Sequence, residues 1–181
     1  GKHVLVEKPF TLSLKEAREI VAAAEKKDLK VQVAQNVRYK PIFITLANLL
    51  KSKIYGEVSF GFQIKVSWRP GVHHSGQMKH SYLWERGVHD FDTLLSLIDS
   101  PVRKVFGRSF NPLWSPYQHG AGICAVIEFE NGLVFNSFCT FSGHQAREEF
   151  LLELEKGTIE VVGSEIRFWN SGSDEYQVIP Q

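Results

Sequence analysis

The part of this chain that follows Pro101 is a succession of short apolar segments separated by turn dipeptides, and this pattern restricts the possible folds most. The segments are rich in β-branched and aromatic residues, which favours strands. Asn131-Gly132, Lys156-Gly157 and Gly163-Ser164 separate several of them. Consecutive strands joined by short turns are typical of an antiparallel sheet. The predicted strands cover 102–109, 124–130, 133–141, 148–155, 158–162, 165–169 and 176–179.

The residues before this run alternate between strand and helix. Ser13 and Glu16 have the spacing of a capping box, which marks the start of the first helix. We therefore predict an α+β fold with a predominantly antiparallel, open-faced sheet, helices on one face of it, and a βαβα unit before it. The predicted elements of the first half are strand 4–6, a helix from Leu14, strand 31–34, a helix after Tyr39, strand 57–68 and a helix at about 83–99.

The size and charge of the chain exclude several classes of partner. Its 181 residues suffice for one domain with a real core, or for one domain and a piece of another. A formal net charge of +1 argues against nucleic acid or an anionic membrane as an obligate partner. No apolar run approaches the roughly 20 residues that span a bilayer, so no membrane segment is expected.

The two cysteines, Cys124 and Cys139, form neither a disulfide framework nor a metal-ligand cluster. Asn131-Gly132 predicts a two-residue hairpin turn, and without a bulge this hairpin places Cys124 opposite Cys139. We expect two reduced, packed thiols in a cytoplasmic protein, because disulfides are rare in that compartment.

The predicted helix at 83–99 carries the first candidate catalytic pair. Glu85 and His89, at positions i and i+4, fall on one side of the helix and can touch. A carboxylate beside an imidazole orients it and raises its basicity, which suits a general base near neutral pH. The alternative is an ordinary solvated helix face. On a helical wheel, the opposite, apolar side contains Val88, Phe91, Leu94, Leu95 and Ile98, whereas Asp92, Thr93 and Ser96 join the polar side.

Two further features have both a functional and a plain interpretation. Lys8 ends a short strand, and Pro9 keeps it out of the helical region, so its side chain leaves the strand in a set direction. The alternative is a solvent-exposed lysine.

Trp68 and Trp84 flank a polar loop, where they can stack on a sugar ring or belong to the core.

Two sequence patterns superficially resemble a dinucleotide-binding loop and a metal site, but their contexts do not support either site. The run 120–125 (Gly-Ala-Gly-Ile-Cys-Ala) matches the dinucleotide fingerprint, but the residues after it alternate like a strand and no strand–turn–helix context surrounds it. His73, His74 and His80 lie in one loop without the spacing of a second ligand pair, so no metal site is predicted.

The order and spacing of four motifs resemble those of the Gfo/Idh/MocA oxidoreductase family. The motifs are Glu7-Lys8-Pro9, Asn36-x-Arg38-Tyr39, Gly87-x-His89-Asp90-x-Asp92 and the late strand pair around 157–161. The resemblance implies a Rossmann domain that binds NAD or NADP, followed by an α/β domain whose open sheet often forms the oligomer interface. By this resemblance, residues 1–36 are the C-terminal edge of a truncated dinucleotide-binding domain. Residues 37–181 are then a substrate-binding and oligomerisation domain.

The resemblance also implies roles for individual residues. Lys8, His89 and Glu85 are the expected catalytic residues for oxidation of a secondary alcohol of a sugar or polyol by hydride transfer. Glu85 stands where the family usually has Asp. The expected cofactor contacts are Glu7, Lys8, Pro9 and Arg38, and the expected substrate contacts are Trp68, Trp84 and Asp90.

The glycine-rich half of the Rossmann domain is missing from this chain, which has hardly any residues before its first predicted strand at 4–6. We therefore expect the chain to be part of a longer protein, to be inactive alone and not to bind NAD or NADP tightly. A homo-oligomer formed through the sheet is expected. The alternative function is a non-catalytic sugar-binding or assembly module that has lost the cofactor domain.

Overall fold

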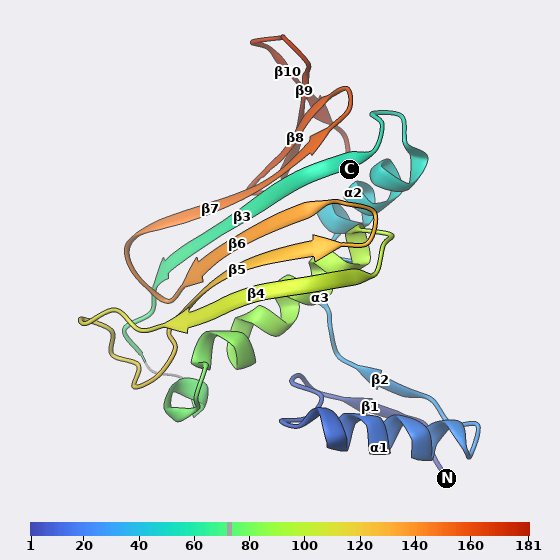
Figure 1. Cartoon of the computed structure of the whole chain (residues 1–181), viewed down its shortest axis with the longest axis vertical. Coiled ribbons are helices and arrows are strands. Elements are labelled where there is room, and N and C mark those ends of the chain that lie inside the picture. The colour runs from blue at the N-terminus through green and yellow to red at the C-terminus, as the bar shows by residue number, and fades with distance from the viewer. Residues whose placement is uncertain (72–73) are drawn as a thin grey trace.

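The computed structural model describes residues 1–71 and 74–181 and is built around one eight-stranded sheet (Figure 1). The strand order is β10-β9-β8-β7-β3-β6-β5-β4, and all neighbours are antiparallel except the parallel pair β3 and β6. The predicted α+β class with a mostly antiparallel sheet is confirmed. The strands are β3 (Val58–Trp68), β4 (Val102–Phe110), β5 (Gly122–Phe129), β6 (Val134–Thr140), β7 (Ser142–Leu154), β8 (Gly157–Val162), β9 (Glu165–Asn170) and β10 (Tyr176–Ile179).

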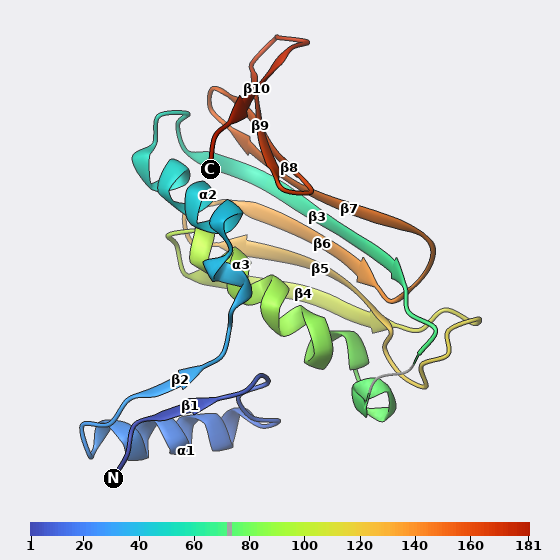
Figure 2. The same ribbon diagram turned by 180° about the vertical axis from the view of Figure 1, so that it is seen from behind.

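Two helices cover one face of this sheet, as Figure 2 shows from behind. They are α2 (Pro41–Ser52) and α3 (Val88–Leu97). Their apolar sides pack on the inward residues of the strands, and burying each large side chain contributes roughly 1.5–3 kcal/mol. No helix of the described residues lies over the other face of the sheet (Figure 1). Fully or almost fully buried members of the main core include Leu46, Leu94, Phe129, Phe135, Leu152, Ile159, Ile166 and Phe168.

The N-terminal residues form a separate small unit at the edge of the helical layer (Figure 2). β1 (Val4–Val6) and β2 (Val31–Val33) pair in parallel, with α1 (Leu14–Glu25) between them in the chain. The Ser13 hydroxyl accepts a hydrogen bond from the Glu16 amide at 3.5 Å, which confirms the predicted cap. A 3-10 helix, η1 (Val37–Tyr39), leads from this unit to α2.

The hairpin between β5 and β6 differs from the prediction by one residue. The Phe129 amide donates to the Leu133 carbonyl at 2.9 Å, so the loop has three residues, with Gly132 at a φ of +89°. A left-handed third residue is typical of such loops. Cys124 therefore lies opposite Phe138, and Cys139 lies opposite Ile123. The predicted pairing of the two cysteines is wrong.

A shift of one residue moves a side chain to the other face of a sheet. Cys139 is buried on the helix-covered face, whereas Cys124 is exposed on the open face, and both thiols are free. The prediction that both thiols are packed is therefore wrong for Cys124.

Strand β7 starts at Ser142, several residues before the predicted strand at 148–155. Its first half is polar and exposed, so it lacks the alternation by which strands are recognised. β3 and β7 are in register up to the pair Val66 and Arg147, and the register then shifts before Trp68 pairs with Ser142. Residues 143–146 of β7 therefore have no β3 partner in this register.

The predicted helix at 83–99 is two elements. Residues 83–87 form a π-helical turn, η3 (Leu83–Gly87), and α3 follows directly. Within α3 the predicted wheel is partly wrong, because Thr93 is buried and Leu95 is 51% exposed. The helix is turned so that Asp90 faces the sheet, where partners from β3 and from Tyr82 satisfy its carboxylate.

None of the helices among the described residues combines the length and the apolar character needed to cross a bilayer.

Candidate active site

The Lys8 amine joins the N-terminal unit to the π-helical turn that precedes α3. Its Nζ donates a hydrogen bond to the Glu85 carbonyl oxygen at 2.8 Å and lies 3.6 Å from Glu85 Oε2. Only 21% of the Lys8 side chain is exposed. The alternative of a solvent-exposed lysine is therefore wrong, and the side chain has a fixed direction at the end of β1.

His89 lies in the first turn of α3, four residues after Glu85. Its side chain is half-buried, and its Nδ1 is buried without a hydrogen-bond partner among residues 1–71 and 74–181. Burial lowers the pKa of His89 below its ordinary value of 6.5, and the positive charges of Lys8 and Arg86 lower it further, against the opposite effect of Asp90 and Asp92. A lowered pKa keeps the imidazole neutral at neutral pH, the form that accepts a proton.

The Glu85 carboxylate is an ion-pair partner of Lys8, with 12% of its side chain exposed. In a π-helical turn the hydrogen bonds run from i to i+5, so the i,i+4 geometry used for the sequence prediction does not apply directly. The predicted contact between Glu85 and the His89 imidazole stays a prediction. The structure adds a second role for Glu85, which is to hold the lysine amine beside the helix.

Arg38 is bound to Asp92 in a two-pronged ion pair. Its Nε and Nη2 lie 2.7 and 2.6 Å from the two carboxylate oxygens, and Nη2 also donates to the Asp92 carbonyl at 3.1 Å. Such planar pairs combine charge with fixed orientation. The pair fastens η1 to α3, and a contact of Arg38, Glu7 or Pro9 with a cofactor stays a prediction.

Asp90 lies beneath the site rather than on its surface. Only 3% of the residue is exposed, and its carboxylate accepts hydrogen bonds from Lys65 Nζ at 2.6 Å and from the Tyr82 hydroxyl at 2.9 Å. Burial, and then the charge of Asp90, raise the pKa of the Tyr82 phenol, which therefore remains a donor. The expected substrate contact of Asp90 stays a prediction, since the side chain is already engaged on two sides.

The structure separates the two predicted tryptophans by element. Trp68 ends β3 and is 45% exposed, with its ring centroid 6.0 Å from that of His144. Trp84 is half-buried in the π-helical turn. The His144 ring also stacks on Trp114 at 5.0 Å, an aromatic contact that sequence reasoning missed. Trp68 is thus not a core residue, and its stacking on a sugar stays a prediction.

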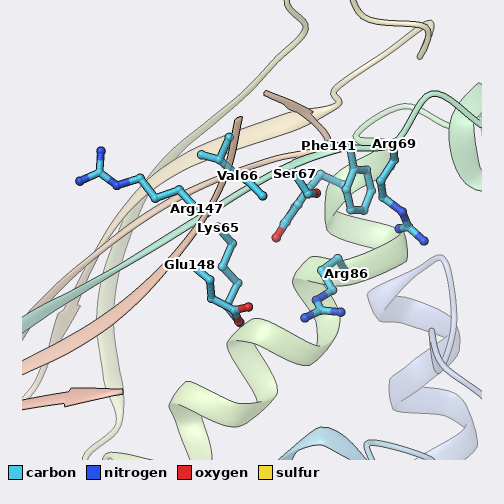
Figure 3. A pocket seen from close by; sticks show the side chains of 10 residues that line it. Lys65, Val66, Ser67, Arg69, Arg86, Phe141, Arg147 and Glu148 are labelled. Carbon is cyan, nitrogen blue, oxygen red and sulfur yellow. The ribbon is translucent and has the colours of Figure 1, made fainter. Parts of the chain in front are cut away.

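A pocket of about 490 Å³ opens where β3 and β7 diverge (Figure 3). Four cationic side chains border it, namely Lys65, Arg69, Arg86 and Arg147. Sequence reasoning missed all four, because they come from separate segments and share no spacing. Lys65 and Arg86 also contact Asp90, the residue after His89, so the pocket adjoins the candidate catalytic residues.

The remaining histidines of the loop give no metal centre. His73 lies outside the described residues, and within 1–71 and 74–181 no group of His, Cys, Asp and Glu side chains is arranged to hold a metal ion. His80 Nδ1 instead bonds the Ser109 hydroxyl.

The residues fit the reacting end of a nicotinamide dinucleotide. A buried Nδ1 without a partner, on an imidazole kept neutral, and a fixed lysine amine are suitable groups for an alcohol that gives up a hydride. The run 120–125 does not supply the phosphate cradle, because Gly122–Phe129 is strand β5, which confirms the sequence interpretation. Among the described residues no glycine-rich turn joins a strand to a helix for the pyrophosphate.

Comparison with known proteins finds relatives of this chain among oxidoreductases. A family model described as the oxidoreductase family with an NAD-binding Rossmann fold (GFO_IDH_MocA) matches residues 1–35. The uncharacterized oxidoreductase YhhX of Escherichia coli is 36% identical over 107 residues, which cover 56% of this chain and 30% of that protein. Oxidoreductase P35 of Formosa agariphila is 27% identical over 172 residues, covering 88% of this chain and 51% of that protein.

Solved structures share the fold over nearly the whole chain. An oxidoreductase from Agrobacterium radiobacter in complex with NAD+, L-tartaric acid and magnesium superposes with a TM-score of 0.85 at 16% identity, covering 98% of this chain and 53% of that one. An inositol dehydrogenase homologue from Azotobacter vinelandii complexed with NADH and myo-inositol gives 0.82 at 13% identity, with 98% and 49% covered. These matches confirm the resemblance to the Gfo/Idh/MocA oxidoreductases, with the family model itself restricted to residues 1–35. It spans about half or less of the length of these relatives.

Proposed function

We propose that this chain supplies the substrate-binding portion of an NAD(P)-dependent oxidoreductase that oxidises a secondary alcohol of a sugar or polyol. In this proposal residues 1–36 are the edge of the dinucleotide-binding domain, and residues 37–181 are the substrate domain. The observation that carries the proposal is the hydrogen bond of 2.8 Å from Lys8 Nζ to the Glu85 carbonyl. It brings the amine from the end of β1 to the turn that immediately precedes the His89 helix.

The chemistry divides between two groups of this chain. His89, neutral because of its lowered pKa, takes the proton of the substrate hydroxyl as a general base. Lys8 donates a hydrogen bond to the same oxygen and stabilises its developing negative charge. Glu85 keeps the Lys8 amine in place. The bound nicotinamide supplies the acceptor for the hydride.

The nature of the substrate is supported by the polyhydroxylated ligands of two structural neighbours. The Azotobacter protein holds myo-inositol, and the Agrobacterium protein holds L-tartaric acid. Both ligands carry secondary alcohols, the group that the arrangement of Lys8 and His89 suits. Trp68, exposed at the end of β3, offers an aromatic face on which a sugar ring can stack.

The test is the rate of hydride transfer in the complete gene product. We expect His89→Ala to lower kcat about 100-fold or more with myo-inositol, D-glucose, D-glucuronate or D-glucose 6-phosphate as substrate and NAD or NADP as acceptor, because general acid–base catalysis has this magnitude. The readout is the absorbance of the reduced nicotinamide. The control is His119→Ala, which removes an exposed imidazole from the loop before β5. An unchanged kcat in His89→Ala would exclude His89 from the mechanism.

A non-catalytic sugar-binding or assembly module is the second candidate. The same assay separates the two, since a complete gene product that binds a sugar but never reduces NAD or NADP fits the module alone.

We further propose that the open face of the sheet joins copies of the chain into a homo-oligomer. Several large apolar side chains are exposed there, which is uncommon on a surface that faces only water. They include Phe60, Phe106, Phe138 and Val178.

A further inference from the structure

The pocket between β3 and β7 is unusual in the sign of its charges. Its lining includes Lys65, Arg69, Arg86 and Arg147, against the single carboxylate of Glu148. The volume of about 490 Å³ suffices for a small polar molecule.

Two of the four cations are engaged. Lys65 Nζ lies 2.6 Å from Asp90 Oδ1 and 4.0 Å from Glu148 Oε1. Arg147 Nε contacts Glu149 Oε1 at 2.5 Å, and Figure 3 shows its side chain extending away from the other labelled cations. The Lys65 charge is therefore compensated, and the Arg147 guanidinium, paired with Glu149, points away from the place where the other cations lie.

The other two cations, Arg69 and Arg86, keep free hydrogen-bonding capacity. The Arg69 guanidinium lies 4.7 Å from the centroid of the Phe141 ring, and no carboxylate of the described residues is within ion-pair distance of it. Arg86 Nε is 3.7 Å from Asp90 Oδ1, an oxygen that Lys65 already holds at the shorter distance of 2.6 Å. The Arg86 side chain is 44% exposed. Figure 3 shows both arginines at the same end of the pocket, beside the helix.

Guanidinium groups bind carboxylates and phosphates through paired N–H donors, and two of them on one pocket suit a doubly contacted oxyanion. Phe141 supports the plane of Arg69, which reduces the freedom that this side chain loses on binding. Arg86 directly follows Glu85, and its charge reaches His89. An anion held here would thus lie next to the proposed catalytic residues.

We propose that Arg69 and Arg86 bind an oxyanion of the substrate, so that the substrate is an acidic sugar or polyol, carrying a carboxylate or a phosphate, rather than a neutral one. This inference rests on the proposed function for the alcohol oxidation, but it concerns binding and has its own readout. The carboxylate and the phosphate share the recognition chemistry, and the experiment distinguishes them.

The test is isothermal titration calorimetry of the 181-residue chain with three probes, D-glucuronate, D-glucose 6-phosphate and D-glucose. We expect at least one anionic probe to bind about tenfold or more tightly than D-glucose, and its affinity to fall as NaCl is raised. Arg69→Gln and Arg86→Gln should each weaken that binding about tenfold and leave the affinity for D-glucose unchanged. The matched control is Arg147→Gln, which removes a charge from the same pocket wall but from a side chain held by Glu149.

The outcomes are separable. Preference for D-glucuronate or for D-glucose 6-phosphate supports the proposal and identifies the anion. The proposal is overturned if charged and neutral probes bind equally or if none of the three binds. It is also overturned if Arg147→Gln loses as much affinity for the anionic probe as Arg69→Gln and Arg86→Gln do. Thermal unfolding of each variant by circular dichroism shows whether it is folded, and Arg69→Lys and Arg86→Lys, which keep the charge, should retain part of the affinity. Hydride transfer plays no part in this assay, so loss of the proposed activity and loss of anion binding are observed independently.

Discussion

The protonation state of His89 is the residue-scale property on which the proposed chemistry depends. Its pKa is lowered first by burial and then by the neighbouring charges of Lys8 and Arg86. Removing the Lys8 charge with Lys8→Met should therefore raise the pKa of His89 toward its ordinary value of 6.5. As a consequence, more of the imidazole would be protonated at pH 6, and the base form would be reached only at higher pH.

The measurement is an NMR titration of the His89 ring proton, assigned by its loss in His89→Gln. Lys104→Met serves as the control, because it removes an exposed charge on the edge strand β4 that is not among the charges acting on His89. A His89 pKa that is the same in Lys8→Met and in the wild-type chain would show that the two groups are not coupled, and would remove the support that this coupling gives to the site.

Residues of the site differ in how far the sequence could predict them. Lys8 and His89 stand in motifs with recognisable spacing, and the structure brings the Lys8 amine to the turn just before His89. Arg69 and Arg86 stand in no motif. They meet only because β3, β7 and the π-helical turn converge, and that convergence is a property of the tertiary structure.

At the scale of elements, the ion pair between Asp90 and Lys65 fastens α3 to the sheet. Asp90 is 3% exposed, and the Lys65 side chain is 15% exposed. Removing one partner of a buried pair leaves the other charge uncompensated. Asp90→Asn should therefore lower the free energy of unfolding by about 3 kcal/mol, measured by urea denaturation. The control is Glu128→Gln, whose partner Arg103 is 66% exposed. This variant should lower the free energy of unfolding by about 0–1 kcal/mol. If both variants lower the free energy of unfolding equally, the buried pair does not stabilise the packing of α3.

The sequence predicts the ends of helices and strands well where turn or capping residues set them. It predicts them less well where contacts with distant segments set them. The strands after Pro101 were found from their turn signals. The register of the β5–β6 hairpin was missed, since the choice between a two-residue and a three-residue loop depends on the φ of Gly132 and not on its identity. The inward position of Asp90 was missed as well, because its partner Lys65 lies in a strand 25 residues earlier.

For the whole molecule, the site lies at the junction between the small N-terminal unit and the helical layer of the sheet. Among residues 1–71 and 74–181, three polar contacts link this unit and the following η1 to the helical layer. They are those of Lys8 with Glu85, of the Gln35 amide with the Val88 carbonyl at 3.3 Å, and of Arg38 with Asp92. All three end on the π-helical turn or the first half of α3. The position of Lys8 relative to His89 therefore depends on how the N-terminal unit sits on this one helix.

The open face of the sheet lies opposite this helical layer, so an assembly through it would leave the junction accessible. Phe138 is 43% exposed there, and it borders a hollow of about 360 Å³ together with Phe62, Ile64 and Cys124. If copies of the chain associate through this face, Phe138→Lys places a charge in an apolar interface, where desolvation opposes association. We expect sedimentation velocity to show an oligomer for the wild-type chain and a monomer for Phe138→Lys. Leu95→Lys, which changes a 51% exposed residue on the helical side, should leave the oligomer intact. A monomeric wild-type chain would contradict the proposed interface, and dissociation by both variants would show that added charge alone, and not this face, separates the copies.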